Sequence, residues 1–239
     1  MVRRVTRRRK PRLRRWTWLL VVGLLVAVGF VLDRFVPAQD LPWKPFSLNR
    51  PIGWATHVQL ARIGYDKTRC EAALAAGDVD FTPEPPRQDG DCHVLNGGRL
   101  GEGLAPFKPA SPLMSCQEAL ALAAWERHGV QPAAYAVFGK QVTSIEHFGT
   151  YACRPMRGHT SGLSEHAFAN AIDVSAFHLS DGRMISVLKD YRAGGDKGRF
   201  LHTVHDQACM IFGHTLGPDF NADHQDHFHL DMGLWGPCR

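Results

Sequence analysis

The chain has 239 residues, of which 44% are hydrophobic and 21% charged. This composition excludes a wholly disordered chain and a collagen-like one, and the length suits one domain of ordinary size with an appendage. The net charge of +5 is unevenly placed, because residues 1–15 contain eight Arg, one Lys and no acidic residue. The other 224 residues therefore carry a net charge of −4. Since the basic character belongs to the tail alone, we expect no nucleic-acid partner.

An uncharged stretch of 17 residues, 16–32, follows the basic tail directly. At about 1.5 Å per residue, a helix of this length nearly crosses a hydrocarbon core roughly 30 Å thick. We therefore predict a transmembrane helix over residues 16–36. The nine cations before it orient the N-terminus toward the cytoplasm. The prediction is a single-pass protein of the inner (cytoplasmic) membrane, with a cytoplasmic tail at 1–15 and a periplasmic or otherwise extracytoplasmic C-terminal domain.

A cleaved signal peptide is the main alternative for this segment. Its apolar region is usually shorter and is followed by a small-x-small cleavage site. No clear A-x-A site follows residue 32, and Trp16 and Trp18 fit the interfacial anchors of an uncleaved helix. A basic arm for nucleic acid is a third interpretation, which the adjoining apolar run disfavours.

The six cysteines all lie beyond the apolar segment. An even number of cysteines on the exported side favours disulfides, for which 15 pairings are possible. No C-x-x-C spacing occurs, so a thiolate zinc site or a redox motif is poorly supported. Cys70 and Cys92 are the expected local pair, since they close a Pro-rich excursion. The pairing of the others stays open: Cys116, Cys153, Cys209 and Cys238.

Four prolines and a lack of apolar periodicity mark residues 37–65, where we predict a Pro-rich tether and lead-in. The globular domain is expected over residues 66–239. Its predicted helices and strands do not alternate regularly. We therefore predict an α+β fold, in which helices flank an antiparallel sheet.

The expected helices are marked by their ends. Ser115 and Glu118 form a capping-box pattern that predicts a helix over residues 116–128, which Gly129 ends. A short helix is expected from Pro132 to Gly139, and a third from Lys197 to Phe212. Strands are expected at residues 142–145, 171–177, 184–188 and 226–232.

The last predicted strand carries alternating polar and apolar side chains. Side chains of a strand point alternately to its two faces, so His227, His229 and Asp231 share one face. Phe228 and Leu230 lie on the other face and are expected to pack on the core. Two imidazoles on a polar face can converge on a metal or a substrate, although an isolated H-x-H pattern also fits a solvated strand.

A second cluster lies between Ser164 and Asp173. It places His166 in a turn of small residues and Asp173 inside a strand, between Ile172 and Val174. A lone carboxylate among β-branched residues is costly unless a cation neutralises it. One Asp and two His make a three-ligand zinc site with a fourth position open for water.

These motifs resemble a known family. The pattern S-x-H-x-x-(G/A)-x-A-x-D at 164–173, followed by H-x-H at 227–229, resembles the zinc peptidases that cleave bacterial peptidoglycan cross-links. That superfamily includes D-Ala-D-Ala carboxypeptidases, lysostaphin-like endopeptidases and the hedgehog signalling fold. More closely, residues 149–154, 164–173 and 216–231 look like the bacterial extensin-like C-terminal domain. The likeness covers roughly residues 66–239, including the cysteines.

The resemblance implies roles for individual residues. His166, Asp173 and His229 correspond to the zinc ligands, so Zn²⁺ is the expected cofactor. His227 matches a histidine that positions or deprotonates the attacking water. Bound zinc lowers the pKa of a water from about 15.7 to about 7 and polarises the scissile carbonyl.

Two positions depart from the carboxypeptidase branch of that superfamily. Ala169 stands where Gly is usual, a mild change if the local backbone avoids positive φ. Asp226 stands where that branch has a glutamate as general base. Asp is shorter, and on a regular strand it would face away from His229. We therefore expect His227 to be the base and Asp226 to orient it.

Three further residues are candidates for substrate binding. Arg154 precedes the metal motif, as a substrate-binding Arg does in those peptidases, and its guanidinium could clamp a peptide carboxylate. An ordinary surface or ion-paired Arg is the alternative. Glu165, beside His166, and His224, in a loop, are weaker candidates. His202 and His205 are spaced for a metal on a helix, but no acidic partner follows them at helical spacing.

We therefore expect a membrane-anchored, zinc-dependent hydrolase that cuts a peptide bond of peptidoglycan stem peptides, as a carboxypeptidase or an endopeptidase. A non-catalytic peptidoglycan-binding or scaffold module, with a structural metal or none, is the second hypothesis. A metal-storage or metal-sensing protein, suggested only by the 13 histidines, is the third. The oligomeric state is not predicted.

Overall fold

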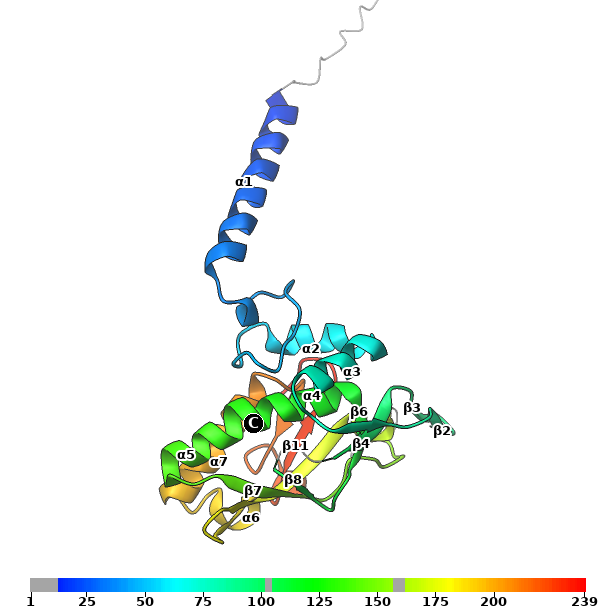
Figure 1. Cartoon of the computed structure of the whole chain (residues 1–239), viewed down its shortest axis with the longest axis vertical. Helices are drawn as coiled ribbons and strands as arrows, with labels where there is room; N and C mark the ends of the chain where they lie inside the picture. Colours follow the sequence, from blue (N-terminus) through cyan, green and yellow to red (C-terminus); the bar gives the residue numbers. More distant parts are fainter. Residues whose placement is uncertain (1–12, 102–104, 157–161) are drawn as a thin grey trace, which may run out of the picture.

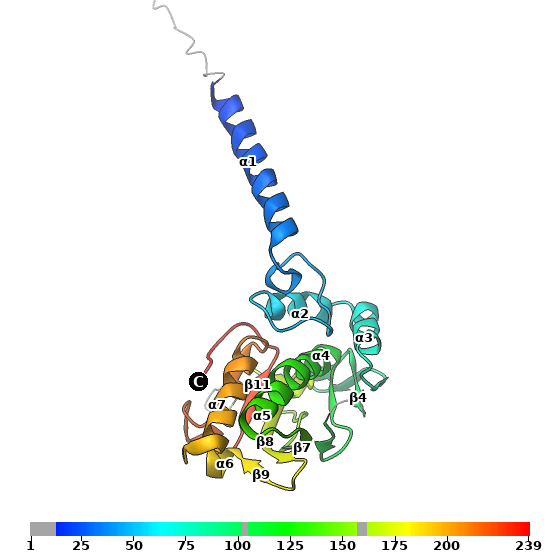
Figure 2. The same cartoon turned by 60° about the vertical axis from the view of Figure 1, so that its left-hand side comes forward.

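The computed structural model describes residues 13–101, 105–156 and 162–239. Helix α1, Leu13–Phe35, stands clear of the folded body (Figures 1 and 2). Its segment Trp16–Phe35 has a mean hydropathy of 2.1, and none of it is buried. By length and composition this helix can cross a membrane, although a signal sequence would meet the same criteria. Residues 1–12 of the predicted basic tail lie outside the described residues.

A six-stranded sheet forms the centre of the body. Its strands follow the order β10-β11-β8-β7-β5, and β9 pairs with β8. All described pairs are antiparallel except β5 with β7. The α+β prediction is thus confirmed, with one parallel pair added. The strand bounds are β5 Phe107–Lys108, β7 Val142–His147, β8 Ala171–Leu179, β9 Met184–Ser186, β10 His214–Leu216 and β11 Phe228–Asp231.

Helices pack against this sheet around one core. Trp125, Phe177 and Phe212 lie at its centre, and the ring of Trp125 meets the other two edge-on. The Trp125 indole N–H donates to the carbonyl oxygen of Val204 at 2.8 Å, which satisfies its one polar group. The helices that supply this layer are α4 Cys116–Trp125, α5 Gln131–Phe138, α6 Val187–Asp190 and α7 Gly195–Cys209.

The prediction that Gly129 ends a helix is wrong. After α4 the helix continues through a π-helical segment, Glu126–Val130, into α5. A Cβ at Gly129 would lie 3.1 Å from Gln207 and 3.2 Å from Trp125. The glycine therefore allows close packing of this helix on α7 instead of stopping it. The stop comes at Gly139, whose φ of 62° is left-handed.

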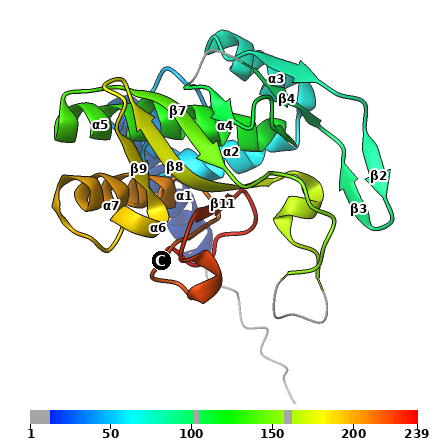
Figure 3. The same cartoon turned by 90° about the horizontal axis from the view of Figure 1, so that it is seen from below.

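Other predicted bounds shift by a few residues. The predicted strand 184–188 ends at Ser186 because Val187 begins α6, and the last strand begins at Phe228 instead of Asp226. Besides β5 and β10 of the central sheet, five other short strands were not predicted, and none of these seven exceeds four residues. The other five form a three-stranded sheet of β1 Phe81–Pro83, β4 Gly97–Leu100 and β6 Leu113–Ser115, and a hairpin of β2 Arg87–Asp89 and β3 Cys92–Val94 that projects from the body (Figure 3).

The segment predicted as tether and lead-in contains a packed helix. Helix α2, Thr56–Gly64, lies between α1 and the body, and Leu60 is fully buried in the core (Figure 1). The Gln59 amide N–H₂ donates to the carbonyl oxygens of Ala38 and Leu41, both at 2.8 Å. Residues 38–41 are thereby fixed on α2. Helix α3, Lys67–Ala76, follows with Asp66 as its N-cap.

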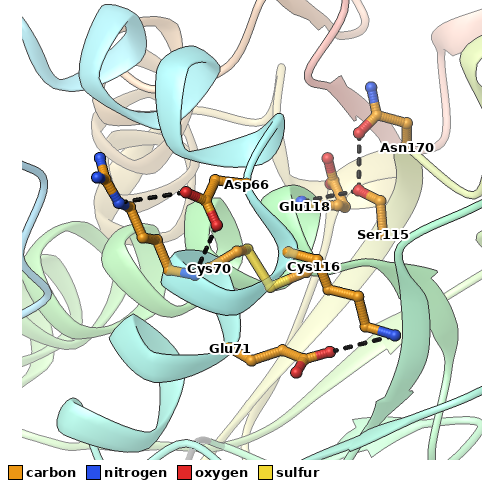
Figure 4. Close-up of a disulfide and its surroundings, with 9 residues drawn as sticks. Asp66, Cys70, Glu71, Ser115, Cys116, Glu118 and Asn170 are labelled. Carbon is orange, nitrogen blue, oxygen red and sulfur yellow. Dashed lines mark hydrogen bonds and ion pairs between the residues drawn. A yellow bond between two sulfur atoms is a disulfide. The ribbon is translucent and has the colours of Figure 1, made fainter.

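The disulfides join Cys70–Cys116, Cys92–Cys153 and Cys209–Cys238. The expected pair Cys70–Cys92 is therefore wrong. Cys70 lies on α3, which packs against α4, so its partner is the first residue of α4 (Figure 4). Long-range pairs of this kind depend on helix packing, which the spacing of cysteines does not reveal.

The predicted capping box forms only in part. Ser115 Oγ accepts from the Glu118 backbone N–H at 3.0 Å and donates to Asn170 Oδ1 at 2.8 Å (Figure 4). The Glu118 carboxyl does not return to the cap. It is fully buried, has no hydrogen-bond partner among the described residues, and burial raises its pKa well above the usual range.

Replacing Leu60 tests whether α2 belongs to the core. We expect Leu60→Ala to lower the free energy of unfolding by about 2–5 kcal/mol, because it removes buried methyl groups and leaves a cavity. Val58 on the same helix is 38% exposed, and Val58→Ala should change stability by less than about 0.5 kcal/mol. Denaturant unfolding followed by circular dichroism measures both. Equally small effects would contradict the packing of α2.

Candidate metal centre

Three side chains from separate elements point their donor atoms at one another. His166 lies in the 3₁₀ turn Glu165–Phe168, Asp173 in β8 and His229 in β11. His166 Nε2 is 3.2 Å from Asp173 Oδ1 and 3.2 Å from His229 Nδ1. His229 Nδ1 is 2.9 Å from Asp173 Oδ1. The structure therefore brings together the three residues that sequence analysis proposed as ligands.

The strand register creates this meeting. In the antiparallel pair of β8 and β11, Asp173 lies opposite His229. Ile172 and Val174, on either side of Asp173, are fully buried in the core, so the carboxylate points to the other face of the sheet. On β11, Phe228 and Leu230 on either side of His229 are also fully buried, so the His229 ring points to the same outer face of the sheet.

The turn that carries His166 is fixed by its own ends. Ser164 caps it by accepting from the His166 N–H, and Asn170 donates to Glu165 Oε2 at 2.8 Å. Ala169 closes the turn with φ 51° and ψ 33°. The replacement of the usual glycine by Ala169 was expected to be mild only if the backbone avoids positive φ, and the backbone does not avoid it. A left-handed alanine costs roughly 1–2 kcal/mol, which the packing of this turn must offset.

The outward nitrogens of both histidines are held. His166 Nδ1 donates to the Thr150 carbonyl oxygen at 3.2 Å, and His229 Nε2 donates to Asp231 Oδ2 at 2.9 Å. Asp231 Oδ1 in turn accepts from His214 Nδ1 at 2.8 Å. Such contacts fix the ring orientation and tautomer of a metal-binding histidine.

The contacts of Asp231 and His214 were not predicted from the sequence. Asp231 was expected on the face of His229, but without a function. The two-residue spacing on a strand was the available signal, since it puts a carboxylate beside the ligand. His214 lies on β10, and nothing in the sequence connects it with β11 before the register His214↔Asp231 is known.

The inner donor atoms leave a charge problem that a cation solves. If both imidazoles are neutral and their outer nitrogens donate, His166 Nε2 and His229 Nδ1 present lone pairs to each other and to Asp173. Three acceptors at 2.9–3.2 Å repel one another unless a proton or a metal ion lies between them. The donor set of two imidazoles and one carboxylate suits zinc, with one position left open.

The pKa values of Asp173 and His229 reflect the same need for a positive charge between them. Burial alone would raise the pKa of Asp173, but hydrogen bonds from His166 and His229 outweigh it and hold that pKa far below its usual range. Burial alone would lower the pKa of His229, but Asp173 and Asp231 outweigh it and raise the pKa to about 9. At neutral pH His229 therefore favours the doubly protonated form, in which Nδ1–H donates to Asp173, and a metal ion bound here would displace that Nδ1 proton.

His227 lies beside this group, as expected. Its Nδ1 donates to Asp226 Oδ1 at 2.8 Å, and its Nε2 is 3.5 Å from Asp173 Oδ1. Asp226 precedes the first residue of β11, so it is free of the strand's alternation and can turn toward His227. The geometry expected of an orienting Asp226 is present.

A cavity of about 340 Å³ opens over the centre. Its lining includes Asp173, His227 and His229, but not His166. The predicted substrate-binding residues Arg154, Glu165 and His224 also line it. Among the described residues, the Arg154 guanidinium makes one hydrogen bond, to the Pro155 carbonyl oxygen at 3.5 Å. Burial raises the pKa of Glu165, and burial beside His227 and His229 lowers the pKa of His224 to about 4.

A second group with suitable donor types, His205, Cys209 and Cys238, cannot hold a metal. Both of its sulfur atoms belong to one disulfide. His202, its neighbour on α7, packs its ring against Tyr191. The helical histidine pair therefore forms no metal site with the described residues.

The pair of His214 and Asp231 predicts a pH dependence of stability. The hydrogen bond to Asp231 raises the pKa of His214 above 6.5. Its stabilisation is therefore fully present below pH 6.5 and is lost as pH rises through the raised value. Between pH 6 and 9, in chelator, wild type should lose more stability than His214→Gln. Urea unfolding measures this, and His202→Gln is the control. Equal losses in wild type and His214→Gln would contradict the pairing.

Comparison with known proteins places this domain in a family. The family model described as extensin-like protein C-terminus matches residues 68–239. No curated protein and no solved structure matches the chain. Since the matched residues make up more than half of the chain and include the whole candidate centre, the chain belongs to the extensin-like C-terminal family.

Proposed function

We propose that this chain is a membrane-anchored, zinc-dependent hydrolase of peptide bonds in bacterial peptidoglycan. The observation that carries the proposal is the convergence of the lone pairs of His166, Asp173 and His229 at one point beneath an open cavity. The resemblance of their motif to zinc peptidases of the cell wall supports the substrate class.

The residues fit a zinc ion. Catalytic zinc sites have three protein ligands and an open position, and His166, Asp173 and His229 supply three. When bound, zinc would lower the pKa of a water to about 7 and polarise the scissile carbonyl. Asp231 and the Thr150 carbonyl oxygen hold the two imidazoles so that their lone pairs face the ion.

His227 and Asp226 supply proton transfer. With Nδ1–H donating to Asp226, His227 Nε2 carries the lone pair and faces the centre. It accepts a proton from the attacking water and returns it to the departing amine. The carboxylate of Asp226 keeps this tautomer and stabilises the imidazolium that forms.

The cavity suits an extended peptide. Arg154 has no carboxylate partner among the described residues and can receive a peptide carboxylate. Beyond Phe220 and Asn221, which line both spaces, lies a second cavity of about 460 Å³. A substrate that continues past the scissile bond can therefore extend along the loop 217–225. Carboxypeptidase and endopeptidase action are both compatible with this cleft.

Helix α1 supports a location at the inner membrane. It is long and apolar enough to span, and it stands clear of the body. The nine cations in residues 1–15 favour a cytoplasmic N-terminus, and with it a periplasmic domain. Three disulfides agree with an oxidising compartment.

The proposed zinc site predicts the metal content of the chain. The purified, oxidised chain should hold about one zinc per molecule, and His166→Ala with His229→Ala should abolish binding. Asp231→Asn should weaken zinc binding about 10–100-fold, because it loosens the grip on His229. Asp181→Asn, in a distant turn, is the matched control. Mass spectrometry of metals and competition with a chelator give the readouts. A folded chain that takes up no zinc would refute the hydrolase.

The proposed proton transfer predicts the effects of replacing His227 and Asp226. His227→Ala should keep zinc but lower turnover of cross-linked muropeptides about 10²–10⁴-fold. Asp226→Asn should reduce turnover about 10–100-fold by disturbing the orientation of His227. His178→Ala, whose ring pairs with Glu146 at the far end of β8, should leave turnover unchanged. Full activity of His227→Ala would transfer the role of base to Asp226. Wall binding without turnover in wild type would favour the scaffold hypothesis.

A further inference from the structure

An exposed aromatic face lies near the C-terminal end of α1. We define it by Trp43, Trp54, Leu234 and Trp235, whose exposed fractions are 47%, 81%, 87% and 61%. Tryptophan in water exposes a large apolar area, and the chain's remaining tryptophan of the folded body, Trp125, is fully buried. Side chains of this size at the surface mark a partner when they gather in one place.

The first two residues of the face are fixed close to the end of α1. Trp43 Nε1 donates to Asp33 Oδ1 at 2.9 Å, and Lys44 Nζ lies 2.7 Å from the same oxygen. The Trp54 backbone N–H donates to Asp40 Oδ1 at 2.8 Å. Since α1 ends at Phe35, these two bonds tie Trp43 and the backbone of Trp54 to residues 33 and 40, close to the point where the chain leaves the helix.

The other two residues reach the same place from the C-terminus. The Trp235 ring meets His57 edge-on, with centroids 4.8 Å apart, and His57 lies near the start of α2, three residues after Trp54. His57 is itself bonded to the Ile211 carbonyl oxygen. The disulfide Cys209–Cys238 closes the C-terminal segment on α7. Trp235 and Leu234 are therefore held beside α2 instead of trailing freely.

The chemistry of the face fits a lipid surface. Tryptophan favours the membrane–water interface, where the ring meets acyl chains and the indole N–H meets headgroups. Residues 33–64 contain the cations Arg34, Lys44, Arg50 and Arg62 against the acids Asp33 and Asp40, and Lys44 is paired with Asp33. An unpaired cation near an anionic membrane adds about 1 kcal/mol of attraction.

We propose that the aromatic face lies in the interfacial layer of the bilayer that α1 crosses. The inference rests on the membrane anchor of the proposed function and adds that the body is seated on the membrane, not suspended below it. The partner is the outer surface of a bilayer containing anionic phospholipid. Pro237 lines the cleft two residues after Trp235, so the aromatic face and the cleft share the C-terminal segment.

The depth of single tryptophans tests this seating. The full chain is placed in nanodiscs of phosphatidylcholine and phosphatidylglycerol, with Trp16, Trp18 and Trp43 replaced by Phe. In one variant Trp235→Phe leaves Trp54 as the exposed indole, and in another Trp54→Phe leaves Trp235. Lipids with a quencher near the headgroup or at mid-chain report depth.

We expect headgroup-level quenching of Trp54 and Trp235, smaller losses with the mid-chain quencher, and no loss of the Trp125 emission that remains when both are Phe. An interfacial element inserts about 5–10 Å into this boundary. As a control, Tyr135→Trp on α5, 70% exposed, should stay unquenched in a chain with Trp54 and Trp235 replaced. Equal quenching of Tyr135→Trp would overturn the proposal.

Other outcomes separate the two proposals. A chain that stays in the disc while Trp54 and Trp235 remain unquenched overturns the seating and leaves the anchor intact. A chain that is cleaved after α1 or does not enter discs overturns the anchor, and the seating with it. Two chains per disc with unquenched tryptophans would show that the face binds a second copy instead of lipid.

Discussion

The candidate centre depends on one carboxylate set within the central sheet. Asp173 lies in a β-strand between two residues that are fully buried in the core, its own side chain is only 17% exposed, and two imidazoles reach its carboxylate. A carboxylate left alone there would cost several kcal/mol or take up a proton. The fold therefore has to bring His166 from a turn and His229 from the last strand to the same point, which fixes the register of β8 with β11.

That register determines both the core and the candidate centre. The inward side chains of β8 and β11, such as Val174 and Phe228, complete the core against α4 and α7, whereas the outward ones build the candidate centre. A slip by one residue would exchange the two sets. The candidate centre and the core are thus specified by the same strand pairing, and neither can change without the other.

The sequence was informative where periodicity decides the outcome. Alternation along two strands was enough to predict that Asp173 and His229 face away from the core, and His227 with Asp226 followed from the resemblance. What depends on packing could not be predicted. The four prolines before α2 favoured a tether over a helix, and Cys70 pairs with Cys116 because α3 packs against α4. His214 reaches Asp231 only through the β10–β11 pairing.

Support around the candidate centre extends beyond the three residues that form it. Asp231 links His229 to His214, and near Asp231 the Glu118 carboxyl is buried without a hydrogen-bond partner in the described part of the chain. Burial raises the pKa of Glu118 well above its usual range, and the charge of Asp231 raises it further. Burial and Asp231 therefore both favour the uncharged form of this carboxyl. Because an uncharged Glu118 does not repel Asp231, the negative charge of Asp231 stays available to hold His229.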